Sequence, residues 1–250
     1  MRTINKFWEV KNATEENTGE IYIYGDIVSY KWYEEDTTAK SFKEDLDALG
    51  DVDVLNVYIN SPGGSVFQGQ AIVSILKRLN SNIKVHIDGV AASIASVIAM
   101  AGHTIHMPSN AMMMIHNPWT WTYGNANELR KQADDLDKIR ESMISMYLDK
   151  AGDKLDRDTL IDLLDKETWL TAQECYDYGL CDVVEEEKEI AASINMDMLS
   201  KYKNTPKELL GRKTEKCNEV INANIKDEEI ESLIARVNNI IKFEEERIYE

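Results

Sequence analysis

A serine and a histidine, Ser93 and His116, have the surroundings in this chain that best suit nucleophilic chemistry. A serine hydroxyl is a poor nucleophile at neutral pH, so it needs a nearby base, a group that orients the base, and donors for the oxyanion. Ser93 follows an apolar run at residues 83–87 and a turn predicted at Gly89. The small and apolar residues after it predict a buried helix whose positive end lies at the hydroxyl. The alternatives are a serine that only caps this helix, and Ser96 as the nucleophile, about one turn further on.

His116 is the candidate base. It stands between the apolar run of residues 112–115 and the pair Asn117-Pro118. A strand must end there, because proline cannot continue the hydrogen-bond ladder. The other three histidines lie in strand-like patterns and are interpreted as structural or surface residues: His86, His103 and His106.

Two glycines, Gly63 and Gly64, follow the strand predicted at residues 54–59 and offer backbone amides that no side chain covers. We expect the amide of Gly64 to supply one oxyanion donor and that of Ile94 the other, since an oxyanion hole needs two amides that converge on one point. A phosphate-binding loop is the alternative. Neither a Walker lysine nor a GxGxxG pattern follows, which counts against it.

The elements that must position these residues alternate between strands and helices. Strands are predicted at residues 21–30, 54–59, 83–87, 103–107, 112–115, 167–170 and 180–184. Helices are predicted at residues 38–49, 66–79, 128–151, 159–164 and 171–179, and in the segment that begins at Ser93. This order predicts an α/β fold with a largely parallel sheet, in which functional groups gather at the carboxyl ends of strands. Gly63, Gly64 and His116, like Ser93, all follow such ends.

The composition changes at about Glu185, where a charge run begins. We interpret residues 1–184 as one catalytic domain and residues 185–250 as an acidic, helical C-terminal extension with an apolar stripe over residues 228–241. Such a stripe suits self-association or a partner helix. A simple solvated tail is the alternative.

The net charge of −17 over 250 residues counts against nucleic-acid binding, which requires a basic surface. The richest apolar run, residues 90–102, is too short for the ~20 residues that cross a bilayer. The N-terminus has no signal-peptide pattern, and we expect a soluble protein of the cytoplasm. Three cysteines without CxxC spacing indicate a reducing compartment and buried apolar roles: Cys175, Cys181 and Cys217.

Three segments resemble, in the same order, the hallmark segments of the Clp peptidase family. They are Asn60-Ser61-Pro62-Gly63-Gly64, Gly89-x-Ala91-Ala92-Ser93 and Met114-Ile115-His116-Asn117-Pro118. The resemblance spans about residues 21–184. It implies a Clp/crotonase-type spiral of repeated ββα units with a long protruding helix, followed here by the helical extension. It also implies a serine endopeptidase in which Ser93 is the nucleophile and His116 the base, with oxyanion amides at Gly64 and Ile94.

The family's third catalytic residue is an aspartate just upstream of an aromatic-Leu-Ser/Thr-Ala stretch, which Trp169-Leu170-Thr171-Ala172 matches. In this chain Glu167 stands in the aspartate's place. A glutamate can accept the imidazole N–H, but its extra methylene changes the reach. We expect Glu167 to orient His116, with Asp165 as the alternative.

The stretches at residues 6–10, 19–27 and 167–169 resemble the Clp-related proteases of bacteriophage head-assembly modules. This resemblance implies a head maturation protease that cleaves scaffold and capsid proteins by a Ser-His-acid acyl-enzyme mechanism. It implies a ring-shaped homo-oligomer in the bacterial host cytoplasm or within the procapsid. No cofactor, metal, nucleic acid or membrane partner is expected.

Three other functions are the alternatives. One is a housekeeping Clp-type peptidase partnered by an ATPase unfoldase. Another is a crotonase-like acyl-CoA enzyme, against which the pairing of Ser93 with His116 argues. The last is a non-enzymatic capsid-assembly scaffold, in which the C-terminal extension would dominate.

Overall fold

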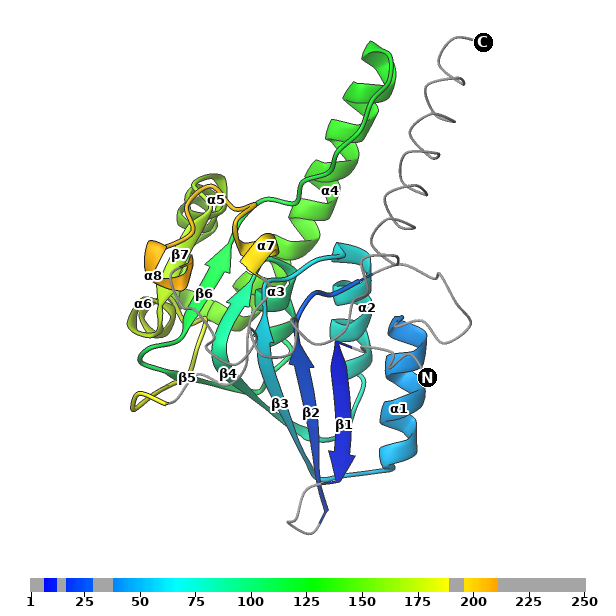
Figure 1. Ribbon diagram of the computed structural model, residues 1–250, viewed down its shortest axis with the longest axis vertical. Helices are drawn as coiled ribbons and strands as arrows, with labels where there is room; N and C mark the ends of the chain where they lie inside the picture. Colours follow the sequence, from blue (N-terminus) through cyan, green and yellow to red (C-terminus); the bar gives the residue numbers. More distant parts are fainter. Residues whose placement is uncertain (1–6, 13–16, 29–37, 189–195, 211–250) are drawn as a thin grey trace, which may run out of the picture. The chain divides into compact units, whose positions relative to one another are not determined.

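A computed structural model describes residues 7–12, 17–28, 38–188 and 196–210 (Figure 1). Its strands are β1 (Trp8–Asn12), β2 (Thr18–Tyr24), β3 (Val54–Ser61), β4 (Asn82–Ala92), β5 (Thr104–Pro108), β6 (Met112–Ile115), β7 (Thr168–Thr171) and β8 (Val183–Glu185). Its helices are α1 (Ala39–Leu49), α2 (Val66–Leu76), α3 (Ile94–Ala99), α4 (Ala126–Ala151), α5 (Arg157–Asp165), α6 (Ala172–Asp177), α7 (Met196–Leu199) and α8 (Lys207–Leu210). A short 3₁₀ turn, η1 (Gly152–Lys154), follows α4.

The described strands form one mixed sheet in the order β1-β2-β3-β4-β5-β8, and β6 pairs with both β4 and β7. Five pairings are parallel: β2–β3, β3–β4, β4–β5, β4–β6 and β5–β8. The pairings β1–β2 and β6–β7 are antiparallel. The predicted α/β fold with a largely parallel sheet is therefore confirmed, as is the long helix, whose N-terminal half extends beyond the sheet (Figure 1).

Local sequence signals explain where several helices begin and end. Thr38 caps α1 in a capping box, and Gly50, at φ +79°, ends that helix as predicted. Thr171 and Glu174 form the predicted capping box of α6. Asn125 caps α4 in the same way. Each cap satisfies backbone N–H groups that the first helical turn leaves without partners.

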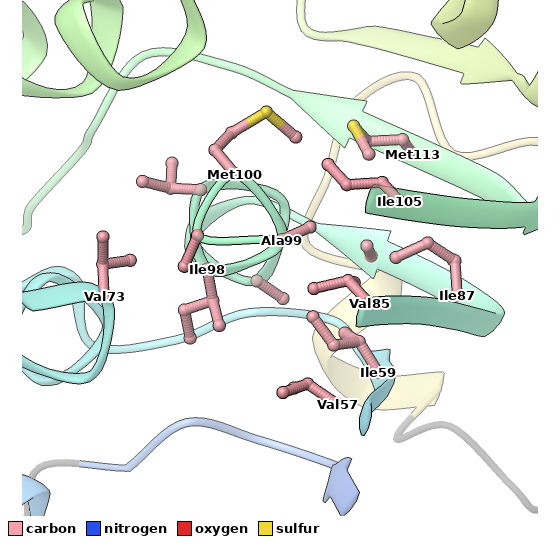
Figure 2. Close-up of a cluster of buried hydrophobic side chains, with 14 of the residues drawn as sticks. Val57, Ile59, Val73, Val85, Ile87, Ile98, Ala99, Met100, Ile105 and Met113 are labelled. Carbon is pink, nitrogen blue, oxygen red and sulfur yellow. The ribbon is translucent and has the colours of Figure 1, made fainter. Parts of the chain in front are cut away.

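The core that supports the site lies between α3 and the central strands (Figure 2). Ile98 and Ala99 of α3 are fully buried, as are Val57 of β3 and Val85 of β4. Val73 of α2 closes the cluster on the other side of α3. Small and apolar residues cover every face of α3, because the helix is enclosed all round.

The structure corrects the predicted course of the chain before Ser93. β4 does not stop at Ile87 for a turn at Gly89; it continues to Ala92. The reason is tertiary, because residues 90–92 pair in parallel with residues 112–114 of β6. Gly89 therefore lies inside a strand, and the turn falls at Ser93 itself.

One strand was not predicted, and several strand limits differ from the prediction by one to a few residues. β1 lies in a stretch to which no strand was assigned, and it forms an antiparallel edge on β2. β2 ends at Tyr24 because Gly25, at φ +87°, turns the chain, and residues 29–30 lie outside the described residues. The last strand begins at Val183, three residues later than position 180.

The beginning of the C-terminal extension packs on the sheet. The first compact unit runs to Leu210, so α7 and α8 belong to it. Leu199, Tyr202 and Leu209 form a second buried cluster with Val90 and Ala92 of β4. The helical stripe predicted at residues 228–241 lies outside the described residues, and the domain boundary after residue 184 stays a prediction. Among the helices that the structure describes, none is long and apolar enough to cross a membrane.

Candidate active site

Ser93 sits at the junction of β4 and α3 in a strained backbone conformation, with φ +56° and ψ −129°. A non-glycine residue at positive φ costs about 1–3 kcal/mol and persists where the surrounding structure imposes it. Ser93 occupies the N-cap position of α3, yet its side chain makes no capping hydrogen bond. The Oγ atom instead lies 2.7 Å from Nε2 of His116. The interpretation of Ser93 as a simple helix cap is therefore wrong.

The parallel pairing of β4 with β6 brings the two residues together. Ala92 is in register with Met114, and the Ser93 amide donates to the Met114 carbonyl over 2.9 Å. Both strands end at this point, so the side chains that follow them meet at the same edge of the sheet. The structure thus joins Ser93 and His116 as the sequence predicted.

The imidazole of His116 is held in its neutral form. The side chain is buried, with 6% of the residue exposed, and burial lowers the pKa of His116 from 6.5 to about 4. Removal of the ring from water penalises the charged imidazolium. A neutral imidazole whose Nε2 faces a serine hydroxyl can accept the hydroxyl proton at pH 7.

Ser96, the alternative nucleophile, supports the turn instead. It is fully buried, and its Oγ donates to the Ser93 carbonyl oxygen over 2.5 Å. Oγ of Ser96 also lies 2.6 Å from the hydroxyl of Tyr147 on α4. Ser96 therefore ties the strained backbone of Ser93 to the long helix.

The Gly63-Gly64 turn packs directly against the nucleophile. A Cβ at Gly63, whose φ is +95°, would lie 2.7 Å from the Ser93 Cβ and 2.6 Å from the Ala92 carbonyl oxygen. Only glycine fits this conformation and this approach. Close packing thus fixes the position of the turn after β3 against the turn after β4.

Gly64 presents its amide away from the neighbouring segment that contains Ile27. The amide of Ile27 donates to the Gly63 carbonyl over 2.8 Å, and that of Ser65 donates to the Ile27 carbonyl over 2.7 Å. The Gly63 C=O and the Gly64 N–H belong to one trans peptide group and point in opposite directions, so the Gly64 N–H points away from Ile27. Gly64 lines the same cavity as Ser93 and His116. The amide of Ile94 belongs to the first residue of α3 and lies in this corner, 3.3 Å from the ideal Cβ position at Gly63.

Neither candidate acid hydrogen-bonds to His116 in this structure. Glu167, at φ +51°, accepts a 2.7 Å hydrogen bond from the backbone amide of Asn204. Asp165 accepts from the Asn117 side-chain amide at 2.7 Å and pairs with Arg140 at 3.2 Å. Both carboxylates line a cavity that His116 also lines. The choice of orienting acid stays a prediction.

Sequence reasoning missed Tyr202, which reaches the site from the C-terminal extension. Its ring stands edge-on to the His116 ring, with 5.3 Å between centroids, and its hydroxyl donates to the Pro62 carbonyl oxygen over 2.6 Å. Burial raises the pKa of Tyr202 to about 12, and the neighbouring Ser93 hydroxyl acts in the opposite direction. The only sequence signal was an apolar pair, Leu199 and Tyr202, at helical spacing in an otherwise polar stretch.

The other chemically active side chains lie apart from this corner. Cys175 and Cys181 are buried, and burial raises the pKa of both thiols, which confirms their apolar role. Cys217 lies outside the described residues. His86 and His106 stack on the sheet at 4.8 Å, and His103 accepts a hydrogen bond from the Ile83 amide.

Comparison with known proteins agrees with this geometry. Residues 20–188 match the model of the Clp protease family. The chain belongs to the Clp protease family. It is 32% identical over 155 residues to a protein of Bacteroides fragilis named ATP-dependent Clp protease proteolytic subunit, a match that covers 60% of this chain and 74% of the relative. A protein of the same name from Ligilactobacillus salivarius is 34% identical over 147 residues, which covers 58% and 73% of the two chains.

Membership of the Clp protease family makes this chain a serine-type peptidase. The matched residues include the three segments that meet at Ser93. The described residues of the extension, α7 and α8, lie beyond the end of the match at position 188.

Proposed function

We propose that this Clp-family peptidase cleaves proteins through an acyl-enzyme on Ser93, with His116 as the general base. The single observation that carries the proposal is the 2.7 Å contact between Ser93 Oγ and His116 Nε2. That contact involves a neutral, buried imidazole and a serine held on a strained turn. A nucleophile within hydrogen-bond reach of its base is the arrangement that acyl transfer requires.

The steps follow from the positions of these atoms. Nε2 of His116 takes the Ser93 proton as Oγ bonds to the scissile carbonyl carbon, and the amides of Gly64 and Ile94 bind the resulting oxyanion. The imidazolium then gives its proton to the leaving amine as the C–N bond breaks. Water attacks the ester with His116 again as base, which frees the acid product and restores Ser93.

The substrate is proposed to bind as an extended chain beside Gly63 and Pro118. Main-chain hydrogen bonds of this kind recognise the backbone rather than the side chains, so sequence preference is broad. Pro118 and Trp119 line the same cavity as Ser93 and Gly64. Gly63 contributes to this substrate-binding turn, because its packing fixes the course of Gly64.

The biological substrates proposed are the scaffold and capsid proteins of a bacteriophage head. The support is the likeness of residues 6–10, 19–27 and 167–169 to head-assembly proteases, together with an extension that begins beyond the Clp match. On this proposal the peptidase acts in the host cytoplasm or inside the procapsid. The relatives named ATP-dependent make an ATPase-partnered housekeeping peptidase the second candidate.

A ring-shaped homo-oligomer is proposed as the working form. The N-terminal half of α4 extends beyond the sheet, and exposed aromatic residues precede it: Trp119, Trp121 and Tyr123. Leu129 is exposed on the same helix. Several large exposed apolar side chains in neighbouring parts of the sequence suit a contact with a second copy. Light scattering of the purified chain tests this proposal, and a monomer at all concentrations would contradict it.

The test of the proposed mechanism uses a serine-directed fluorophosphonate and the Ser93→Ala variant. We expect mass spectrometry to place the adduct on Ser93, and we expect Ser93→Ala to lose peptide hydrolysis while keeping its fold and assembly. Ser109→Ala is the matched control, because Ser109 is an exposed serine in the turn after β5 and this variant should still be modified at Ser93. Equal peptide hydrolysis by Ser93→Ala and the wild type would refute the mechanism.

The same variant separates the biological roles. Co-expression with phage scaffold and capsid proteins should yield cleaved products with the wild type and none with Ser93→Ala. Normal capsid assembly without any cleavage by the wild type would instead favour a non-enzymatic scaffold. Hydrolysis that appears only with an added ATPase unfoldase would favour the housekeeping candidate.

A further inference from the structure

The start of the C-terminal extension covers the catalytic pair. Ser93 and His116 are only 8% and 6% exposed. Tyr202 lies against the pair, with its ring edge-on to His116 and its hydroxyl on the carbonyl of Pro62 beside the Gly63-Gly64 turn. Met198 and Lys201 of the same segment also line the cavity at Ser93.

The space that remains at Ser93 is too small for a polypeptide. The cavity holds about 100 Å³, whereas pockets that accept even small organic ligands hold roughly 300–1,000 Å³. A carbonyl carbon must come within roughly 3–3.5 Å of Oγ to react. Three residues of the chain's own C-terminal extension line this small cavity directly beside Ser93: Met198, Lys201 and Tyr202.

Specific contacts hold this segment in place. Leu199, Tyr202 and Leu209 are buried against the face of β4 and β6 that carries Val90, Ala92 and Met114. Asn204 then adds polar contacts to the loop before β7. Its side-chain amide donates to the Lys166 carbonyl over 2.7 Å, and its backbone amide donates to Glu167 Oε1 over 2.7 Å.

The contact with Glu167 bears directly on catalysis. Glu167 is the residue expected to orient His116, and its carboxylate here serves Asn204 instead. The described segment therefore makes two contacts that oppose turnover: it shields the nucleophile from substrate, and it engages the expected acid. Both contacts come from residues 199–209, beyond the part of the chain that matches the family.

We propose that residues 198–209, which we call the cover segment, are an internal occupant of the substrate site that keeps the peptidase latent until it is displaced. The proposal rests on the proposed function of Ser93 and His116. Tyr202 is the residue that fills the position of a substrate side chain, and the site it occupies takes a bulky aromatic or aliphatic group. Displacement opens Ser93 and frees Glu167 from Asn204 at the same time.

The size of the effect follows from populations. An enzyme that is competent only when the cover segment is displaced reacts in proportion to the displaced fraction. Variants that weaken the packing of the cover segment on the sheet raise this fraction without changing Ser93 or His116. We expect Tyr202→Ala and Leu199→Asp in the full-length chain to react at least tenfold faster than the wild type.

The experiment measures two rates on the full-length chain: modification of Ser93 by a fluorophosphonate and hydrolysis of a fluorogenic peptide. Tyr202→Phe isolates the hydroxyl contact with Pro62 and should give a smaller increase than Tyr202→Ala. Tyr176→Ala is the matched control, because Tyr176 is an exposed tyrosine on α6, and its rate should equal that of the wild type. A synthetic peptide with the sequence of residues 196–210 should inhibit Leu199→Asp competitively.

The outcomes separate the two proposals. Equal rates of Ser93 modification in the wild type, Tyr202→Ala and Leu199→Asp would overturn the proposal that the cover segment keeps the peptidase latent. The proposed mechanism at Ser93 would still stand. Ser93 that stays unmodified in every folded variant would instead overturn the mechanism on which this inference rests. If Leu199→Asp misfolds, the rates of Tyr202→Ala and the competitive inhibition of Tyr202→Ala by the same peptide are the deciding measurements.

Discussion

Acidification should reveal how strongly the fold excludes a charged His116. Burial lowers the pKa of His116 from 6.5 to about 4. At about 1.4 kcal/mol for each pH unit between these values, folding disfavours the imidazolium by roughly 3 kcal/mol. The chain contains 4 histidines, so the NMR spectrum of histidine-labelled protein has few imidazole signals. The signal that disappears in a His116→Gln variant belongs to His116. We expect that signal to titrate with a midpoint near the value of about 4.

The same shift predicts how stability changes with pH. Because the pKa of His116 is lower in the folded chain, the unfolded chain binds more protons between pH 6.5 and pH 4. The stability is therefore complete above pH 6.5 and falls as the pH drops towards 4. From pH 7 to pH 5 the contribution of His116 amounts to about 2 kcal/mol. Between pH 7 and pH 5, the free energy of unfolding measured in urea should therefore fall by this amount more in the wild type than in His116→Gln.

Two results would refute this reasoning. A midpoint near 6.5 for the His116 signal would mean that the imidazole is solvated. Equal losses of unfolding free energy in the wild type and His116→Gln would mean that protonation of the ring costs the folded state nothing. Tyr202→Ala provides a further check, because removing the ring that lies on His116 should raise its pKa towards 6.5.

Three further predictions concern the residues around the pair. Gly63→Ala should lower kcat/KM at least ~100-fold, since displacing reacting groups by about 1 Å costs that much. Gly50→Ala, also at positive φ but with open space around it, should keep activity, and equal activities of the two variants would contradict the packing argument. Tyr147→Phe should lower the free energy of unfolding by ~0.5–1.5 kcal/mol because it removes the buried hydrogen bond between the Tyr147 hydroxyl and Ser96 Oγ, while the bond from Ser96 to the Ser93 carbonyl stays. No change in urea unfolding would argue against that. Glu167→Gln should lower kcat by ~10²–10⁴ if this residue orients the base, and a larger loss in Asp165→Asn would transfer the role to Asp165.

Local sequence patterns identified most of the fold. Alternating strand and helix signals predicted the α/β layers, and the capping boxes and Gly50 marked helix ends because each depends on neighbouring residues alone. The course of β4 through Gly89 could not be predicted in this way. It depends on hydrogen bonds to β6, which a local pattern does not contain.

The same division applies to the site. The segments around Gly63, Ser93 and His116 could be named from the sequence, because residue types and strand ends limit which side chains can do this chemistry. Only the tertiary structure decided that the nucleophile and the base lie 2.7 Å apart, since that distance comes from the pairing of β4 with β6. It also decided that Tyr202, more than a hundred residues from Ser93, lies over the pair. Its position comes from apolar packing on a face of the sheet that exists only once the strands have paired.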